Sequence, residues 1–200
     1  MSDLGFVGLG AIGGAIAERL LTQKHRLRVY DINADALTRL VDLGASNGQS
    51  CMELSAGCEI VFLSLPSPEV VEHVVLGQSG LLSQSKKLRY IVDLSTNSPQ
   101  LSRKISAAAE QVGVNYLDAP VSGGRAGAKK GTLSVMIGGS ASAFEAIKPI
   151  ILGLGANIFH VGPSGSGSLA KLVNNQIFLS TSIVVQEAFM MGLKAGMQPQ

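Results

Sequence analysis

The stretch Gly8-Leu9-Gly10-Ala11-Ile12-Gly13 decides the fold. It directly follows a short apolar run at residues 4–7 and opens a helical pattern at about residues 12–22. A Gly-x-Gly-x-x-Gly sequence between a strand and a helix is typical of a dinucleotide-binding turn. The first glycine allows the tight turn, the second lets the backbone approach a pyrophosphate, and the third lets the helix pack on the strand. We therefore expect all six residues to contact a dinucleotide.

An acidic residue ends the second predicted strand at Asp31. It follows the glycine turn at roughly the spacing of about 20 residues at which such domains place the carboxylate that binds the adenosine ribose. A 2′-phosphate on this ribose would lie about 4 Å from the carboxylate and be repelled by roughly 1 to 4 kcal/mol. We therefore expect NAD to be preferred over NADP. The alternative is that Asp31 only caps the turn near Asn33.

Short β-branched runs alternate with amphipathic helical patterns, which predicts an α/β fold: a doubly wound, mainly parallel sheet of the Rossmann type. The expected strands are residues 4–7, 28–30, 60–65, 90–94, 116–118, 133–137 and 157–161. The expected helices are residues 12–22, 34–43, 68–76, 99–112 and 141–152, with Asn33, Ser67 and Ser98 as caps.

After residue 162 the pattern changes to one long helix at about residues 168–195. We therefore expect a dinucleotide-binding domain at residues 1–162 and an interdomain helix at residues 163–200. Apolar residues spread around this helix, which indicates burial on more than one side, and the first domain can cover only one of them. Gln186 and Glu187 interrupt its apolar run, which is also short for a bilayer span, so we expect no transmembrane segment.

Composition indicates that the partner is a small molecule or another subunit. The chain has 200 residues and 46% hydrophobic residues, too many for a disordered protein, and a net charge of +2 gives no reason to expect nucleic acid or an anionic membrane as a partner. Its two cysteines, Cys51 and Cys58, have no histidine nearby in sequence to complete a metal site, so we expect no metal and a reducing compartment. We expect the cytoplasm, or the mitochondrial matrix if a transit peptide has been removed.

Three later segments carry candidate site residues. Leu65, Pro66 and Thr96 lie at the ends of predicted strands. Ligands of open α/β sheets lie beyond such strand ends, although these residues also suit simple turns. Ser122-Gly123-Gly124 follows another strand, and its hydroxyl and backbone N–H groups could hold a carboxylate. Lys171 and, one turn later on the same helix face, Asn175 form an arrangement suited to proton transfer, although most helical lysines are solvated.

Together, in this order, these segments resemble the β-hydroxyacid dehydrogenase family, which includes 3-hydroxyisobutyrate dehydrogenases and tartronate semialdehyde reductases. The matching stretches are residues 8–17, 118–124 with Gly131-Thr132-Leu133, and Gly165-Ser166-Gly167 with Lys171, Asn174 and Asn175. The resemblance implies that Lys171 is the catalytic acid/base and that Asn175 helps to orient both this lysine and the substrate. It further implies that Ser122, Gly123, Gly124 and Asn174 hold the substrate, and that Leu65, Pro66 and Thr96 line the cofactor. A lysine here argues against the related imine reductases, and 6-phosphogluconate dehydrogenases are longer.

The resemblance also implies that the long helix begins an all-helical C-terminal domain that is otherwise missing, so that the chain is truncated. Two functions follow. In the first, the protein transfers hydride between NAD and a small 3-hydroxy acid similar to 3-hydroxyisobutyrate or to the tartronate semialdehyde/glycerate pair. In the second, the chain is an inactive dinucleotide-binding fragment that dimerises through its uncovered helix. In both, exposed apolar helix surface predicts a homo-oligomer, a dimer or a tetramer.

Overall fold

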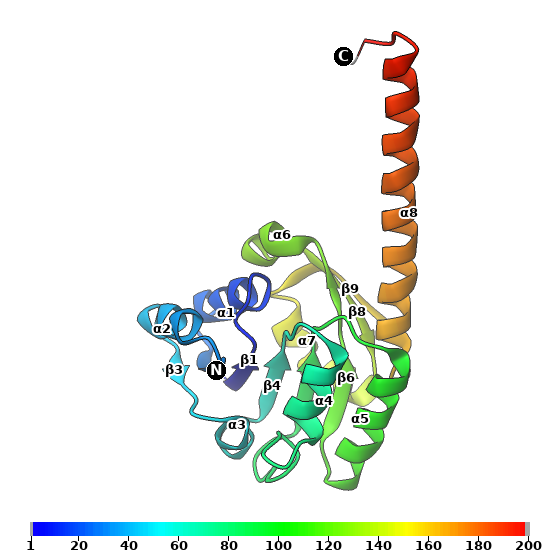
Figure 1. The fold of residues 1–200 in the computed structure, drawn as a ribbon. Helices are drawn as coiled ribbons and strands as arrows, with labels where there is room; N and C mark the ends of the chain where they lie inside the picture. Colours follow the sequence, from blue (N-terminus) through cyan, green and yellow to red (C-terminus); the bar gives the residue numbers. More distant parts are fainter. Residues whose placement is uncertain (1, 199–200) are drawn as a thin grey trace.

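The computed structural model describes residues 2–198 and contains a nine-stranded sheet with helices on both faces (Figure 1). The strands are β1 (Asp3–Val7), β2 (Arg26–Tyr30), β3 (Ser46–Asn47), β4 (Ile60–Leu63), β5 (Tyr90–Asp93), β6 (Asn115–Asp118), β7 (Val121–Ser122), β8 (Leu133–Gly138) and β9 (Gly155–Gly162). The helices are α1 (Gly13–Thr22), α2 (Ala34–Asp42), α3 (Cys51–Gly57), α4 (Pro68–Leu76), α5 (Pro99–Gln111), α6 (Gly124–Lys130), α7 (Ala141–Ile151) and α8 (Ser166–Lys194).

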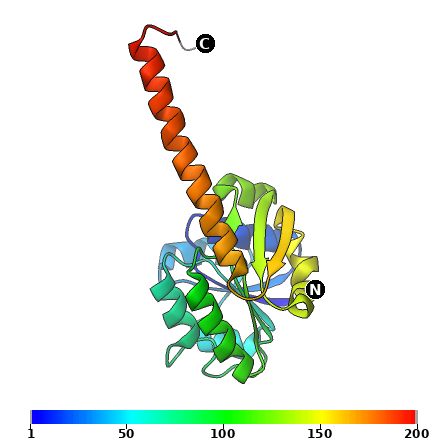
Figure 2. The ribbon, with the colours of Figure 1, turned by 90° about the vertical axis from the view of Figure 1, so that its right-hand side faces the viewer.

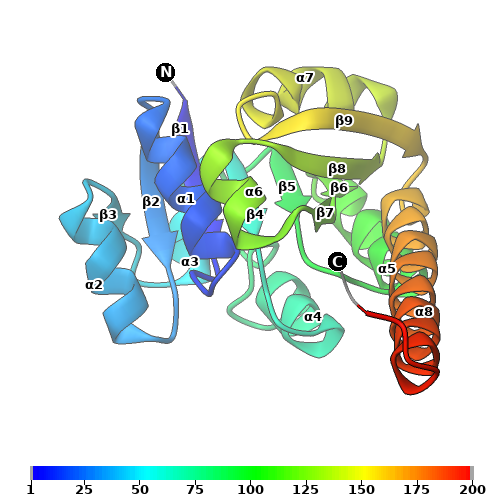
Figure 3. The ribbon, with the colours of Figure 1, turned by 90° about the horizontal axis from the view of Figure 1, so that it is seen from above.

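The sheet confirms the predicted Rossmann-type fold. Its strand order is β3-β2-β1-β4-β5-β6-β8-β7, with β9 paired to β8, and the pairs from β3 to β6 are all parallel (Figure 3). The chain reverses direction only at β8, which runs antiparallel to β6 and β7. Because β1, β4, β5 and β6 are parallel neighbours, the turns that follow them meet at one edge of the sheet, where ligands of such folds bind.

Local capping explains why the predicted helices start where they do. The side chains of Asn33, Ser67 and Ser98 accept hydrogen bonds from the first turns of α2, α4 and α5, as predicted. Four short elements were not predicted: the two-residue strands β3 and β7, and the seven-residue helices α3 and α6. They are too short to show a periodic apolar pattern, so their positions depend on the sheet beside them.

Two apolar cores, one on each face of the sheet, hold the domain together. Phe6 and Phe62 stack at 6.0 Å between ring centroids in the first core, to which α1, α6 and α7 contribute. The second core contains buried residues of α3, α4 and α5, among them Leu54, Val71 and Ile105. Helices on both faces are what a doubly wound sheet requires.

The long helix α8 extends away from this domain (Figures 1 and 2). Its buried residues are Gly167 and Ser168 alone. The first domain covers only the start of the helix, up to the half-buried Lys171, Asn174 and Asn175. The exposed large apolar side chains of α8 are Leu169, Leu172, Val173, Ile177, Phe178, Leu179, Ile183, Val184, Val185, Phe189, Met190, Met191 and Leu193.

By length and composition, α8 is also the one helix within residues 2–198 that could cross a membrane. It has 29 residues, and its most apolar 18-residue window has a mean hydropathy of 1.3. The apolar run judged short for a bilayer span is only part of this helix, which as a whole is long enough to span one. Such a helix alone is weak evidence for a membrane span, and the absence of a membrane partner stays a prediction.

Candidate functional site

The glycine turn between β1 and α1 has the geometry of a dinucleotide cradle. A Cβ at Gly13 would lie 2.0 Å from the carbonyl oxygen of Gly8 and 2.9 Å from Cβ of Ser64, so only glycine lets α1 start this close to β1 and β4. A Cβ at Gly10 would meet no protein atom within 4 Å, so the space in front of Gly10 is open. No side chain caps α1, and its first turn holds no acidic residue. The turn therefore fits a pyrophosphate, whose oxygens would accept hydrogen bonds from the backbone N–H groups at the start of α1.

Asp31 lies beside the same turn. One of its carboxylate oxygens, Oδ2, accepts a hydrogen bond from the backbone N–H of Leu9, and the other, Oδ1, accepts one from the N–H of Asn33 at 2.7 Å. The carboxylate thus orders the turn before α2 and also reaches the glycine turn, while its contact with a ribose stays a prediction. Each carboxylate oxygen keeps a second lone pair with which to accept a ribose hydroxyl.

The turns after β4 and β5 are joined to each other. The backbone N–H of Leu65 donates to Oγ of Ser95 at 2.9 Å. Pro66 and Thr96 are exposed at this edge. The backbone oxygen of Ser64 lies against Gly8, at 2.3 Å from where a Cβ would stand, so the glycine turn and the turn after β4 are in contact. Leu65, Pro66 and Thr96 therefore belong to the same edge as the glycine turn.

A buried carboxylate, Asp93, organises the turn after β5. It accepts hydrogen bonds from the Ser95 N–H at 3.0 Å, the Asn97 side-chain amide at 3.3 Å and the Tyr116 hydroxyl at 2.7 Å. Burial raises the pKa of Asp93, and burial together with the neighbouring Asp93 carboxylate raises the pKa of Tyr116. Sequence reasoning missed Asp93, although an acidic residue inside the apolar run of β5 was a visible signal.

The turn predicted to hold a carboxylate follows β6 at the same edge. Ser122 ends β7, and the next two residues, Gly123 and Gly124, have φ angles of +125° and +61°. Residues that carry a side chain rarely adopt such φ angles, so the backbone here favours glycine. Ser122 is half-buried, and Gly123 and Gly124 are exposed.

Asp118, at the end of β6, binds the start of α8. Its Oδ1 accepts a hydrogen bond from the Gly165 N–H at 2.8 Å, and its Oδ2 accepts one from the Ser168 N–H at 2.7 Å. Ser168 is further tied to α5 by a contact of 2.9 Å between its Oγ and that of Ser102. Burial raises the pKa of Asp118, although the backbone hydrogen bonds act in the opposite direction. The first turn of α8 is thus attached to the same strand that leads to Ser122.

Lys171 lies just beyond this attachment. It is half-buried, as are Asn174 and Asn175, whereas the neighbouring Leu172 and Val173 are exposed. The lysine takes part in none of the ion pairs found within residues 2–198. Burial lowers the pKa of Lys171, which is the direction that a catalytic base requires. A partly desolvated ammonium without a partner is suited to exchange a proton with a bound substrate.

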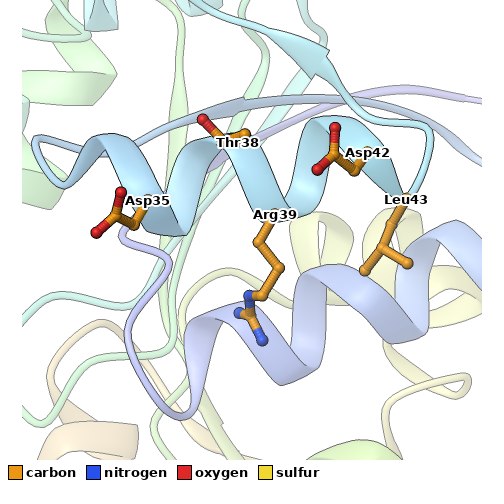
Figure 4. A pocket seen from close by; sticks show the side chains of 5 residues that line it. All are labelled: Asp35, Thr38, Arg39, Asp42 and Leu43. Atoms are coloured by element: carbon orange, nitrogen blue, oxygen red, sulfur yellow. The ribbon is translucent and has the colours of Figure 1, made fainter.

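The hollow in Figure 4 is a different feature. It has a volume of about 440 Å³ and is lined by residues of α2 and its C-terminal end: Asp35, Thr38, Arg39, Asp42 and Leu43. Arg39 points from it toward α1, where its guanidinium donates to Glu18 at 2.8 Å. None of the five residues was predicted as a site residue, and we assign this hollow no function.

The glycine turn before α1, with the carboxylate of Asp31 beside it at the carboxyl edge of the sheet, is typical of a nicotinamide-dinucleotide-dependent oxidoreductase of the Rossmann class. Residues 3–162 match a family described as the NAD binding domain of 6-phosphogluconate dehydrogenase. The chain is 40% identical to 3-hydroxyisobutyrate dehydrogenase of Pseudomonas aeruginosa over 199 residues, which cover 100% of the chain and 67% of that protein. We conclude that the chain belongs to the β-hydroxyacid dehydrogenase family.

Two further relatives agree with this assignment. The chain is 40% identical to 2-hydroxy-3-oxopropionate reductase of Escherichia coli, with 98% of the chain and 67% of that protein covered. The crystal structure of Mycobacterium tuberculosis 3-hydroxyisobutyrate dehydrogenase with L-serine superposes with a TM-score of 0.91 at 32% identity, covering 99% of the chain and 67% of that protein. The chain thus spans about two thirds of the length of these relatives, and the match includes α8.

Proposed function

We propose that the protein transfers hydride between NAD and a small 3-hydroxy acid, with Lys171 as the general acid/base. The observation that carries the proposal is the position of Lys171. It is half-buried and unpaired on a helix that is attached to the same strand as the turn at Ser122, and this strand ends at the dinucleotide-binding edge. Substrates similar to 3-hydroxyisobutyrate or to the tartronate semialdehyde/glycerate pair are favoured, because the relatives named above act on such compounds.

Each group has a defined task in this proposal. Ser122, Gly123 and Gly124 hold the substrate carboxylate with a hydroxyl and backbone N–H groups. In the oxidative direction the neutral amine of Lys171 accepts the hydroxyl proton as the hydride leaves the substrate carbon, and in the reductive direction the ammonium returns that proton. Asn174 binds the substrate, and Asn175 orients the amine. NAD supplies the hydride acceptor, while the protein holds the substrate and the proton acceptor in register.

The cofactor is bound by residues at the carboxyl edge of the sheet. The glycine turn from Gly8 to Gly13 receives the pyrophosphate, Asp31 receives the adenosine ribose, and Leu65, Pro66 and Thr96 line the nicotinamide half. The carboxylate of Asp31 supports a preference for NAD, because it would repel the additional phosphate of NADP.

Replacing Lys171 by Ala tests the proposal. In the full-length protein, we expect Lys171→Ala to abolish turnover of a panel of 3-hydroxy acids, followed by nicotinamide absorbance, and to leave the Kd for NAD nearly unchanged. The neighbouring exposed Leu172→Ala serves as the matched control and should retain turnover. Undiminished turnover in Lys171→Ala would disprove the catalytic role.

The second candidate, an inactive fragment that binds a dinucleotide and dimerises through α8, is favoured by one observation. Beyond its first turn, α8 exposes apolar side chains on all sides, with Phe178 66% exposed. An exposed surface of this kind usually marks an interface. If the 200-residue chain binds NAD and is dimeric in sedimentation but shows no hydride transfer, this candidate is correct for the chain. We propose a homo-oligomer in either case, and a cytoplasmic or mitochondrial-matrix location.

A further inference from the structure

The carboxylate of Asp118 joins two parts of the candidate site that are far apart in sequence. It accepts hydrogen bonds from Gly165 and Ser168, which lie 47 and 50 residues further along the chain. Asp118 also ends the strand β6, and the turn that begins at Ser122 follows four residues later. Lys171 follows Ser168 by three residues, slightly less than one helical turn. One side chain thus lies between the proposed carboxylate-binding turn and the proposed acid/base.

The first turn of α8 depends on this contact for its direction. The residue at the helix start, Gly165, has no side chain with which to cap the helix, so Asp118 supplies the missing acceptors. Gly167 and Ser168 are the buried residues of the helix. Further along, the large apolar side chains of the helix are exposed, so the contacts at its start, those of Asp118 and the packing of Gly167, set the direction in which Lys171 points.

Geometry and charge both favour a carboxylate at this position. The two backbone N–H donors lie on one helix turn, and each is matched by one oxygen of the carboxylate, so both are satisfied. A negative charge at a helix N-terminus is also stabilised by the helix dipole. An amide of the same size can accept through one atom only, and its NH₂ group would face the second donor.

We propose that Asp118 is a positioning residue for catalysis: by holding the first turn of α8, it fixes the direction of Lys171 relative to the carboxylate-binding turn. This inference rests on the proposed role of Lys171. It differs from that role in assigning Asp118 no contact with the substrate or the cofactor.

The decisive variant is Asp118→Asn in the full-length protein. A misplacement of about 1 Å at a reacting group can cost about 100-fold in rate, so we expect kcat to fall by about 10- to 100-fold while the Kd for NAD stays within about twofold. Ser102→Ala is the matched control, because it removes the other polar contact of Ser168 without removing the carboxylate. We expect it to change kcat by less than about threefold, since neutral hydrogen bonds are weaker than charged ones.

Asp93→Asn provides the contrast from the neighbouring strand. Asp93 orders the turn that carries Thr96, so its replacement should weaken NAD binding and leave kcat at saturating NAD largely intact. An unchanged kcat in Asp118→Asn, or an equal loss of kcat in Ser102→Ala, would overturn the inference. If Asp118→Asn does not fold, the same comparison is made with Asp118→Ser, whose shorter side chain withdraws both carboxylate acceptors without placing an NH₂ group opposite the helix.

Hydrogen exchange separates this inference from the proposed function. The amide of Ser168 should exchange at least 10-fold faster in Asp118→Asn than in the unmodified protein, and unchanged exchange would contradict the positioning role. If the unmodified protein turns over no hydroxy acid, the proposed function fails. Exchange at Ser168 would then still show whether Asp118 holds the helix.

Discussion

Two alanine substitutions in the glycine turn distinguish ligand contact from packing. At Gly10, a Cβ meets no protein atom within 4 Å, and the residue is not among the glycines with positive φ. Gly10→Ala should therefore leave the domain as stable as before, or stabilise it by about 0.4 to 1 kcal/mol by restricting the unfolded chain. At Gly13, the Cβ would lie 2.0 Å from the Gly8 carbonyl oxygen, and such overpacking typically costs about 1 to 3 kcal/mol.

The two variants should separate stability from cofactor binding. Gly13→Ala should lower Tm by about 2 to 12 °C, because 1 kcal/mol corresponds to about 2 to 4 °C for a chain of this size. Gly10→Ala should keep its Tm but lose one charge-assisted hydrogen bond to the pyrophosphate, which is worth about 1.5 to 3 kcal/mol and reduces NAD affinity by about 10- to 150-fold.

Calorimetric titration with NAD measures the affinity directly, which suits a chain without tryptophan fluorescence. Differential scanning calorimetry of the same samples gives Tm. If Gly10→Ala bound NAD as tightly as the unmodified protein, the pyrophosphate could not lie in the open space in front of Gly10. The assignment of this turn as the cofactor cradle would then be wrong.

Three further predictions follow from single groups. Asp31→Asn should shift the free-energy preference for NAD over NADP by about 1 to 4 kcal/mol toward NADP, and an unchanged ratio of the two Kd values would contradict the ribose contact. Burial lowers the pKa of Lys171 below the usual value of 10.5. As the pH rises and the amine loses its proton, kcat for oxidation should therefore rise through an inflection below 10.5, whereas kcat for reduction should fall. If any residual activity of Lys171→Ala kept the same inflection, this lysine could not be its source. Burial raises the pKa of Cys58 to about 11, so the folded protein should react with a thiol reagent at pH 8 far more slowly than the urea-unfolded protein, and equal rates would contradict the buried position.

The fold could be predicted from sequence because its signals are local. The glycine turn lies directly between β1 and α1, and Asn33, Ser67 and Ser98 each cap a helix within three residues of themselves. The partners in such short-range hydrogen bonds are close in sequence, so the sequence alone is enough to predict them. The short elements α3 and α6 carry no comparable periodic signal, and they were missed.

The candidate site was predictable only in part, since some of its order comes from contacts between distant residues. Asp93 binds Tyr116 from the next strand, and neither residue type alone indicates a role. The positions of Asp93 and Tyr116 depend on the pairing of β5 with β6, in which Asp93 lies beside Asp118. Nothing in the spacing of Asp93 and Asp118 along the chain shows that the two carboxylates meet at one edge.

The glycines that precede Lys171 show how a motif can be recognised before its physical role is understood. In sequence, Gly165-Ser166-Gly167 belongs to the pattern on which Lys171 was predicted to be catalytic. In the structure, a Cβ at Gly167 would lie 2.3 Å from the Asp118 carbonyl oxygen and 2.4 Å from that of Met136. Gly167 is therefore required for the helix to pack directly on the backbone of β6 and β8. This close packing brings the Ser168 N–H within reach of the Asp118 carboxylate, so Gly167 helps to place the helix that carries Lys171.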